Sequence, residues 1–141
     1  MNAQSLASTG WKDFCPSDFA GSVGPFWYRG RGEELTVGLM TEMRHANAHR
    51  KTVHGGALMS FADVALGFAV ADMLGGPYCV TVDLQVQFVA AAPAGKFLTC
   101  QPEVVRRASQ LVFMRGLLRV EDTVVASANG VWKVLQPRPP S

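Results

Sequence analysis

The chain has 141 residues, close to the usual size of one domain, and we expect a single domain over 1–141. Hydrophobic residues make up 48% of it and charged residues 17%, which is typical of a compact globular protein and argues against disorder. Thirteen Lys and Arg against eleven Asp and Glu give a formal charge of +2, so neither a nucleic-acid-binding protein nor one that binds anionic membranes is expected. The low share of charges suggests that part of the surface is buried against another copy of the chain.

The three cysteines, Cys15, Cys79 and Cys100, are odd in number and widely spaced, and no CxxC pair occurs. We therefore expect neither a disulfide framework nor a zinc knuckle, and we predict no metal or bound cofactor. Cys79 and Cys100 lie among apolar residues and fit small core side chains in a reducing compartment. Residues 1–11 have neither a basic start nor an apolar stretch of the secretory type, so we expect a cytoplasmic protein.

Residues 1–33 have the weakest pattern and are predicted to form an N-terminal arm or a short helix. Strand-type aromatics occur at 25–28, and apolar residues roughly alternate over 34–42. These two patterns predict two short strands before the middle of the chain. A polar loop follows at 44–53.

The segment 57–74 is rich in Ala, Leu, Met and Phe and poor in β-branched residues, which favours a helix. It is apolar nearly all round, as in a helix packed on more than one side, and Gly75-Gly76-Pro77 should end it. The segment is at the short end for a membrane span and contains Asp63 and Asp72. We therefore predict a helix buried inside a globular protein.

The second half of the chain changes to a period of two. Apolar and polar residues alternate over 80–88, with the row Thr81, Asp83, Gln85 and Gln87 on the polar face. Three more strands are predicted around 98–104, 112–120 and 124–134, with Arg106 to Gln110 as a polar connection and Pro102 as the mark of an edge or a bulge.

Residues 136–141 form a proline-rich tail that cannot continue a sheet. Four consecutive strands with short turns favour an antiparallel meander, and each has an apolar face that needs a cover. The buried helix is the only element large enough to supply that cover. The sequence therefore predicts an α+β fold, in which a curved antiparallel sheet wraps around one long central helix.

Asp63 is the strongest catalytic candidate, because it lies near the middle of the most apolar stretch. A carboxylate there must be paired, protonated or functional. Apolar surroundings would raise its pKa toward that of a useful general base. The alternative is an ordinary helix aspartate bonded to a backbone amide or an arginine.

His54-Gly55-Gly56 stands at the junction of loop and helix, where the first amides of a helix are unpaired donors. Such an amide could stabilise a carbonyl oxygen that gains negative charge, although a flexible helix start is an equally simple explanation. Gly55 and Asp63 should lie about 12 Å apart along the helix axis. One substrate carbonyl therefore reaches both groups most easily if they come from two subunits of a dimer.

The string Val53-His54-Gly55-Gly56 through Asp63 resembles the hotdog-fold acyl-CoA thioesterases of the phenylacetate-degradation type, which have HGG at the start of the central helix and an acid nine positions after the His. The stretch 81–88 with Pro93-Ala94-Gly95 also looks like that family's long strand and turn. The resemblance covers roughly 34–135. It implies a hotdog fold and hydrolysis of an acyl-CoA substrate by a homo-oligomer, a dimer or a tetramer of two dimers, with sites at the subunit interface.

The resemblance also implies roles for single residues. Asp63 would be the general base or nucleophile, the Gly55 amide would polarise the thioester carbonyl from the partner subunit, and Thr81 would help to hold the attacking water. His54 would orient the loop. The family often has an Asn or Gln six positions before the His, and this chain has Ala48 there with Asn47 beside it.

The CoA moiety would need further contacts. Gly56 allows a close approach to the backbone, and Arg106, Arg107 and Ser109 could bind the CoA phosphates, although a solvated turn explains these three equally simply. Two rival functions stay open: a hydratase or dehydratase on the same fold, acting on an enoyl or hydroxyacyl thioester, and a non-catalytic acyl-CoA-binding protein.

Overall fold

The computed structural model describes residues 1–136, so the predicted tail 136–141 lies outside the described residues except for its first residue. The helices and 3-10 turns, in chain order, are α1 (Ala3–Ser8), η1 (Phe19–Ser22), η2 (Gly32–Glu34), η3 (Met43–His45) and α2 (Gly55–Leu74). The strands are β1 (Lys12–Phe14), β2 (Phe26–Arg29), β3 (Thr36–Met40), β4 (Cys79–Phe88), β5 (Phe97–Cys100), β6 (Glu103–Arg107), β7 (Leu111–Val120) and β8 (Thr123–Val134).

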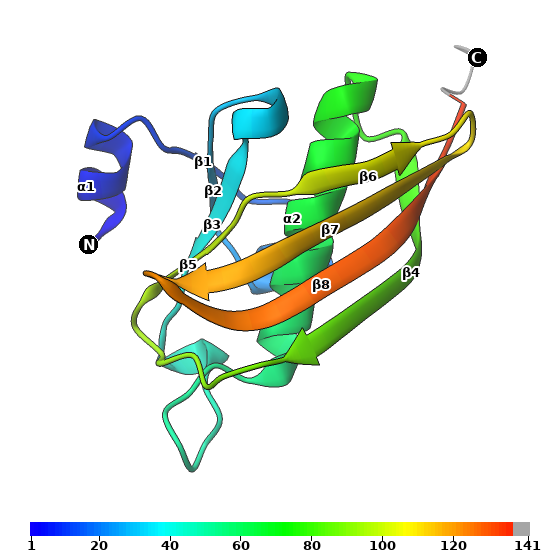
Figure 1. Ribbon diagram of the computed structural model, residues 1–141. Helices are drawn as coiled ribbons and strands as arrows, with labels where there is room; N and C mark the ends of the chain where they lie inside the picture. Colours follow the sequence, from blue (N-terminus) through cyan, green and yellow to red (C-terminus); the bar gives the residue numbers. More distant parts are fainter. Residues whose placement is uncertain (137–141) are drawn as a thin grey trace.

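The predicted α+β architecture is confirmed. All strand pairs are antiparallel, and they form one sheet in the order β1-β2-β3-β5-β7-β8-β4, with β6 also paired to β7. The sheet curves around α2, which crosses its inner face (Figure 1). Gly75 ends α2 as a left-handed cap with φ +77°, a conformation that glycine adopts without strain.

The predicted four-strand meander is right for the strands over 98–134, because β5 and β6 pair with β7 and β7 pairs with β8, but it is wrong for β4. Among the described strands β4 pairs only with β8, so it lies at one edge of the sheet instead of beside β5. The segment 89–96 is not a tight hairpin turn. It runs past the start of α2, where Thr52 bridges Pro93, and carries the chain from the β4 edge back to the middle of the sheet (Figure 1). The other long edge of β4 is left open.

Pro102 interrupts the predicted strand around 98–104, as its missing N–H suggested. The chain forms two short strands there, β5 and β6, which both pair with β7. The expectation that Arg106 to Gln110 is a connection is wrong for its first two residues. Arg106 and Arg107 belong to β6, opposite Phe113 and Val112, because β7 continues far enough to pair with them.

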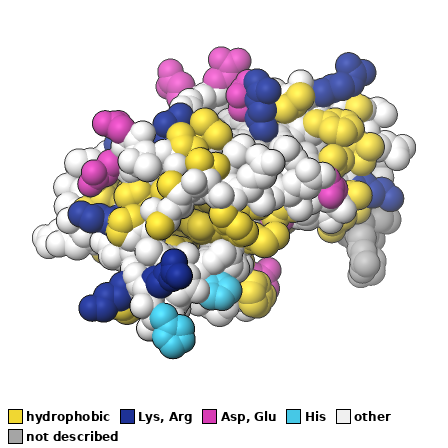
Figure 2. All heavy atoms as spheres, turned by 60° about the horizontal axis from the view of Figure 1, so that its bottom comes forward, with side chains coloured by type: hydrophobic (Ala, Val, Ile, Leu, Met, Phe, Trp, Pro, Cys, Tyr) yellow, Lys and Arg dark blue, Asp and Glu magenta, His cyan; other side chains and the backbone are white. Residues whose placement is uncertain are grey.

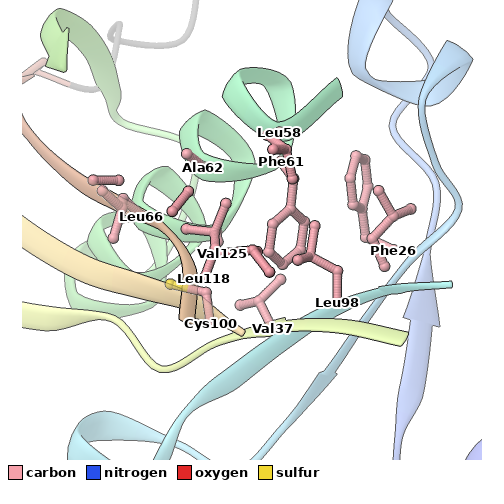
Figure 3. Close-up of a cluster of buried hydrophobic side chains, with 14 of the residues drawn as sticks. Phe26, Val37, Leu58, Phe61, Ala62, Leu66, Leu98, Cys100, Leu118 and Val125 are labelled. Carbon is pink, nitrogen blue, oxygen red and sulfur yellow. The ribbon is translucent and has the colours of Figure 1, made fainter. Parts of the chain in front are cut away.

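The main core lies between α2 and the inner face of the sheet. Phe61, Ala62 and Leu66 of the helix are fully buried against strand residues such as Val37 and Leu98 (Figure 3). By length and composition alone α2 could cross a membrane, but a core helix passes the same test. The sheet wrapped around it accounts for the apolar character of α2.

The N-terminal arm contains the expected short helix, α1, but its aromatic residues follow the helix. Trp11 packs with Leu6, Trp27 and Phe97 in a second small cluster, and its ring meets Phe97 edge-on with centroids 5.0 Å apart. Phe14 lies in β1 and contacts the main core. The arm therefore extends the sheet by two strands, β1 and β2, which the patterns at 1–33 only partly indicated.

Residues 16–24, which we call the strap, are held against the loop that leads to α2. The Arg44 guanidinium donates hydrogen bonds to the carbonyl oxygens of Ser22, Val23 and Gly24. Buried His45 donates through Nε2 to the Val23 carbonyl at 2.7 Å and accepts the Glu42 amide at Nδ1. This clamp fixes the strap beside the first turn of α2.

Candidate active site

Asp63 and Thr81 form a direct pair between α2 and β4. The Thr81 hydroxyl donates a hydrogen bond of 2.6 Å to Asp63 Oδ1. Asp63 is half-buried and Thr81 is exposed, so the carboxylate is at the rim of the core and not enclosed in it. Thr81 bonds to one carboxylate oxygen of Asp63. The second oxygen has no hydrogen-bond partner among residues 1–136, so it is available to a ligand.

A β-bulge at Val82 brings Thr81 to the helix. Thr81 lies opposite Trp132 and Asp83 opposite Val131, so Val82 is the extra residue on β4. Directly opposed residues point to the same face, and Trp132 is buried against α2. Thr81 therefore faces inward. The expectation of one polar row with Asp83, Gln85 and Gln87 is wrong for Thr81, because the bulge shifts the alternation by one residue.

Cys79 lies next to this pair, and the sequence analysis gave it no role in the site. Burial raises the pKa of its thiol, and the negative charge of Asp63 raises it further. The bulge also explains this position, because Cys79 shares the inner face with Thr81, two residues away. In the sequence Cys79 is a cysteine among apolar residues, and nothing in that pattern indicates that it lies close to Asp63.

The start of α2 has one free amide. His54 is the N-cap, and its Nδ1 accepts a hydrogen bond of 2.8 Å from the Gly56 amide. The amides of Ala57 and Leu58 donate to the His54 carbonyl. Within the described part of the chain no group accepts from the Gly55 amide. Of the two glycines, Gly55 therefore presents the available donor. The role of His54 in orienting the loop stays a prediction.

The Phe88 ring covers Gly55. A Cβ placed on Gly55 would lie 3.1 Å from Phe88 Cζ, a tight contact in which the ring would have to move by a few tenths of an ångström. Phe88 is the last residue of β4, and its side chain is 55% exposed. Gly55 thus lies at the Phe88 end of β4, whereas Asp63 lies at the Thr81 end. The two groups do not meet within one chain.

Asn47 belongs to the loop before α2. Its amide nitrogen Nδ2 is 3.5 Å from Thr52 Oγ1, and its backbone amide donates to the Thr52 carbonyl. These contacts close a small hairpin, in which Ala46 bridges Val53. Among the described residues Asn47 has no hydrogen bond to Asp63 or Gly55, so a direct role stays a prediction.

Arg106, Arg107 and Ser109 are exposed and lie away from Asp63 within one chain. The register aligns Arg107, Val112, Trp132 and Thr81 in one row across four strands. Three strand spacings of about 4.8 Å put Arg107 roughly 14 Å from Thr81 along that row. The structure therefore does not bring these residues to the Asp63–Thr81 pair of their own chain.

Two hollows border the first turn of α2. One, of about 370 Å³, lies between the strap and Gly56, Ala57 and Ser60. The other, of about 390 Å³, lies beside Gly55, Phe88 and the segment 89–92. Exposed hydrophobic side chains are spread across the face of the molecule at which α2 begins (Figure 2). A larger hollow of about 510 Å³ contains none of the predicted site residues.

No set of three or more His, Cys, Asp or Glu side chains within residues 1–136 could hold a metal ion. The site thus consists of a carboxylate with a hydroxyl partner and a free helix-start amide, both on the central helix of a wrapped antiparallel sheet. The fold and these features together define a protein of the hotdog class.

The chain belongs to the thioesterase superfamily, whose model matches residues 50–127. A Pseudomonas aeruginosa protein named "Putative esterase PA0474" is 36% identical over 112 residues, which cover 78% of this chain and 83% of that protein. The segment that the family model matches contains Gly55, Asp63 and Thr81.

Solved structures have the same fold. Thioesterase superfamily member 2 of zebra fish has a TM-score of 0.74 at 19% identity, over 84% of this chain and 88% of that one. PaaI of the E. coli phenylacetic acid degradation operon has 0.65 at 20%, over 96% and 86%. The BH2602 protein of Bacillus halodurans, solved with CoA, has 0.64 at 25%, over 71% and 66%. The predicted resemblance to the phenylacetate-degradation type of hotdog thioesterase is thereby confirmed at the level of family and fold.

Proposed function

We propose that the chain is an acyl-CoA thioesterase, which converts an acyl-CoA and water into a free acid and CoA. The Asp63–Thr81 pair is the observation that carries this proposal. A hydroxyl that bonds one carboxylate oxygen orients the other toward a ligand, and the short bond is of the charge-assisted kind. A carboxylate held in this way can take a proton from water or attack a carbonyl carbon.

In the general-base form of the reaction, Asp63 takes a proton as the water oxygen bonds to the thioester carbon. The carbonyl oxygen becomes negative, and the Gly55 amide donates a hydrogen bond to it. The C–S bond then breaks, and the CoA sulfur takes the proton from Asp63. In the nucleophilic form, a carboxylate oxygen of Asp63 bonds to the thioester carbon, and the C–S bond breaks to release the CoA thiolate. Water then hydrolyses the resulting anhydride to the free acid and the Asp63 carboxylate, and the proton released goes to the thiolate.

CoA as the leaving group is supported by the Bacillus halodurans neighbour, which was solved with CoA. Hydrolysis is supported by the esterase name of the Pseudomonas aeruginosa relative. We propose that Arg106, Arg107 and Ser109 serve the CoA phosphates, which the amide-bearing arm of CoA holds at a distance from the thioester.

A second copy of the chain completes the proposed site, and the open edge of β4 is where it would bind. The Val89 amide donates to Val125 of β8, so the antiparallel alternation directs the main-chain groups of Leu84, Val86 and Phe88 to the open edge. An unpaired edge of this length invites a second strand. Exposed apolar side chains along it, such as Val80 and Val82, favour the same contact.

One pairing register of β4 with the partner's β4 would bring the Asp63–Thr81 pair of one subunit to the Gly55 amide of the other. If Gln85 lies on the two-fold axis, Leu84 pairs with the partner's Val86, and the bulge puts Thr81 opposite the partner's Phe88. Both of these side chains then lie on the inner face of the joined sheet. The partner's Gly55, which lies beneath the partner's Phe88, thus approaches Asp63, which lies beneath Thr81. This meeting of two subunits is what the spacing of the two residues along the helix predicts.

The test is a thiol-release assay over a panel of acyl-CoAs. We expect wild type to release CoA, Asp63→Ala and Asp63→Asn to be inactive, and Asp72→Asn, a matched change on the exposed side of the same helix, to keep full activity. Near-wild-type kcat in both Asp63 variants would refute the mechanism. Turnover of enoyl-CoA without thiol release would indicate a hydratase, and tight binding without any turnover would indicate a binding protein.

A further inference from the structure

Phe88 is an exposed aromatic side chain on the inner face of the sheet. Its register partner on β8 is Ala126, which is buried in the core, so the Phe88 ring points to the same side as α2. Leu84 and Val86, on the same face of β4, pack against the main core, whereas Phe88 extends beyond it and is 55% exposed. The contacts of the ring are therefore at the start of α2 and not in the core.

The tip of the Phe88 ring points at Gly55. A Cβ on Gly55 would lie 3.1 Å from Cζ and 3.5 Å from both Cε atoms, so the far end of the ring is the part that approaches. The backbone that follows the ring is held in place, because the amides of Val89 and Ala90 both donate to the Val125 carbonyl. The ring therefore has a defined position beside the first residue of α2.

The Gly55 amide stays accessible beside the ring. The first N–H groups of a helix point out of its N-terminal end, whereas the ring lies where a Cβ would project from Gly55. A thioester oxygen that accepts from this amide would therefore have the ring at its flank. An apolar ring there excludes water, and a hydrogen bond to a developing negative charge is stronger where water is excluded.

We propose that Phe88 shields the Gly55 amide from water and so strengthens its hydrogen bond to the thioester oxyanion in the transition state. This inference rests on the proposed thioesterase function and adds one residue to its machinery. The pairing of β4 edges proposed above places the same ring opposite the partner's Thr81. Phe88 then borders both the donor amide of its own chain and the Asp63–Thr81 pair of the other, at the point where the carbonyl carbon reacts.

The test measures kcat and KM of Phe88 variants on acyl-CoAs with acyl groups of increasing length. Phe88→Ala admits water, and we expect kcat to fall about tenfold on every acyl-CoA, less than the roughly 10²–10³-fold that loss of a whole oxyanion donor costs. KM should stay within about twofold, because the shielding acts in the transition state. Phe88→Met keeps an apolar side chain of similar reach and should restore most of kcat. Leu117→Ala removes an exposed apolar side chain from the outer face of β7 and is the matched control, with kinetics like those of wild type.

Three outcomes would overturn the shielding role although the enzyme is a thioesterase: an unchanged kcat in Phe88→Ala, a change in KM alone, or a loss of kcat that spares the shortest acyl group. The last would make the ring a wall for the acyl group. If wild type releases thiol from no acyl-CoA, the proposed function itself fails, and this inference fails with it. Phe88→Leu keeps apolar bulk at the β4 edge but is shorter than the ring. It replaces Phe88→Ala if gel filtration or melting curves show a changed assembly or fold, and should give a similar loss of kcat.

Discussion

The Thr81 hydroxyl bonds to Asp63 at 2.6 Å although the two residues are 18 positions apart and lie on different elements. This contact predicts the behaviour of two variants. Thr81→Val keeps the shape but removes the donor, and we expect kcat to fall about tenfold or more, the usual cost of a hydrogen bond to a charged group. Thr81→Ser keeps the hydroxyl and should retain most of the activity. Steady-state kinetics on one acyl-CoA measures both.

Thermal melting supplies the control for this pair of variants. Thr81 is exposed, so we expect both variants to melt within a few degrees of wild type. Equal activity in Thr81→Val and wild type would show that the hydroxyl does not position the carboxylate.

The charge of Asp63 should be measurable through its neighbour Cys79. Burial and the Asp63 charge both raise the pKa of this thiol, and a raised pKa means less thiolate and slower labelling at a given pH. Asp63→Asn removes the second cause, so the Cys79 pKa should fall and labelling at pH 8 should become about two- to fivefold faster. Burial remains, so the rate should stay below that of a free thiol.

A Cys15→Ser background simplifies this measurement. Cys15 is exposed, whereas burial raises the pKa of the Cys100 thiol to about 12, so Cys79 is then the thiol that reacts. Asp72→Asn is the matched control and should leave the rate unchanged. A rate that is the same in Asp63→Asn and its parent would contradict the proximity of the two side chains.

The proposed pairing of β4 with the partner's β4 predicts a single position at which a cysteine would cross-link the two subunits. With Gln85 on the two-fold axis, the two copies of residue 85 form a non-hydrogen-bonded pair, with Cα atoms about 4.5 Å apart, which is within the range of a disulfide. Gln85→Cys in the Cys15→Ser background should therefore give a covalent dimer on mild oxidation, seen on a non-reducing gel. Asp83→Cys and Gln87→Cys, on the same face, should stay monomeric on that gel.

Other outcomes would change the register. Cross-linking through Leu84→Cys in place of Gln85→Cys would move the axis by one residue and separate Thr81 from the partner's Phe88. A monomer at micromolar concentration in solution would refute the shared site altogether.

His54 should contribute stability as an N-cap, independently of any reaction. His54→Ala removes the acceptor of the Gly56 amide and should lower the free energy of unfolding by about 0.5–2 kcal/mol. His54→Asn supplies another acceptor at the same place and should recover most of that loss. Urea denaturation measures all three proteins. If His54→Ala is as stable as wild type, the cap has no energetic role.

The sequence predicted the central helix, its glycine cap, the strands that flank it and the wrapped sheet, because these depend on local periodicity and on turn residues. It did not predict the strand order. The alternation over 80–88 is the same for an edge strand paired with β8 and for a strand paired with β5. Which of the two forms depends on where the chain enters the sheet after α2.

The candidate site was predicted by its residue types, but its geometry was not. Asp63, Gly55 and Thr81 were named from their spacing and the family resemblance. Strict alternation nevertheless placed Thr81 on the outer face, because a bulge leaves no mark in the apolar pattern of β-branched residues. The Gly55 amide is the free one because His54 accepts the amide of Gly56 instead, and the sequence does not show which of the two glycines His54 caps.

The clamp on the strap has a consequence for how the chain can diverge. Arg44 and His45 contact residues 22–24 through carbonyl oxygens alone, and every amino acid presents that group. Residues 19 and 22 can therefore be exchanged without loosening the attachment. The strap can serve as an exchangeable segment in directed evolution, where libraries at these two positions would alter the hollow beneath it and leave the Asp63–Thr81 pair unchanged.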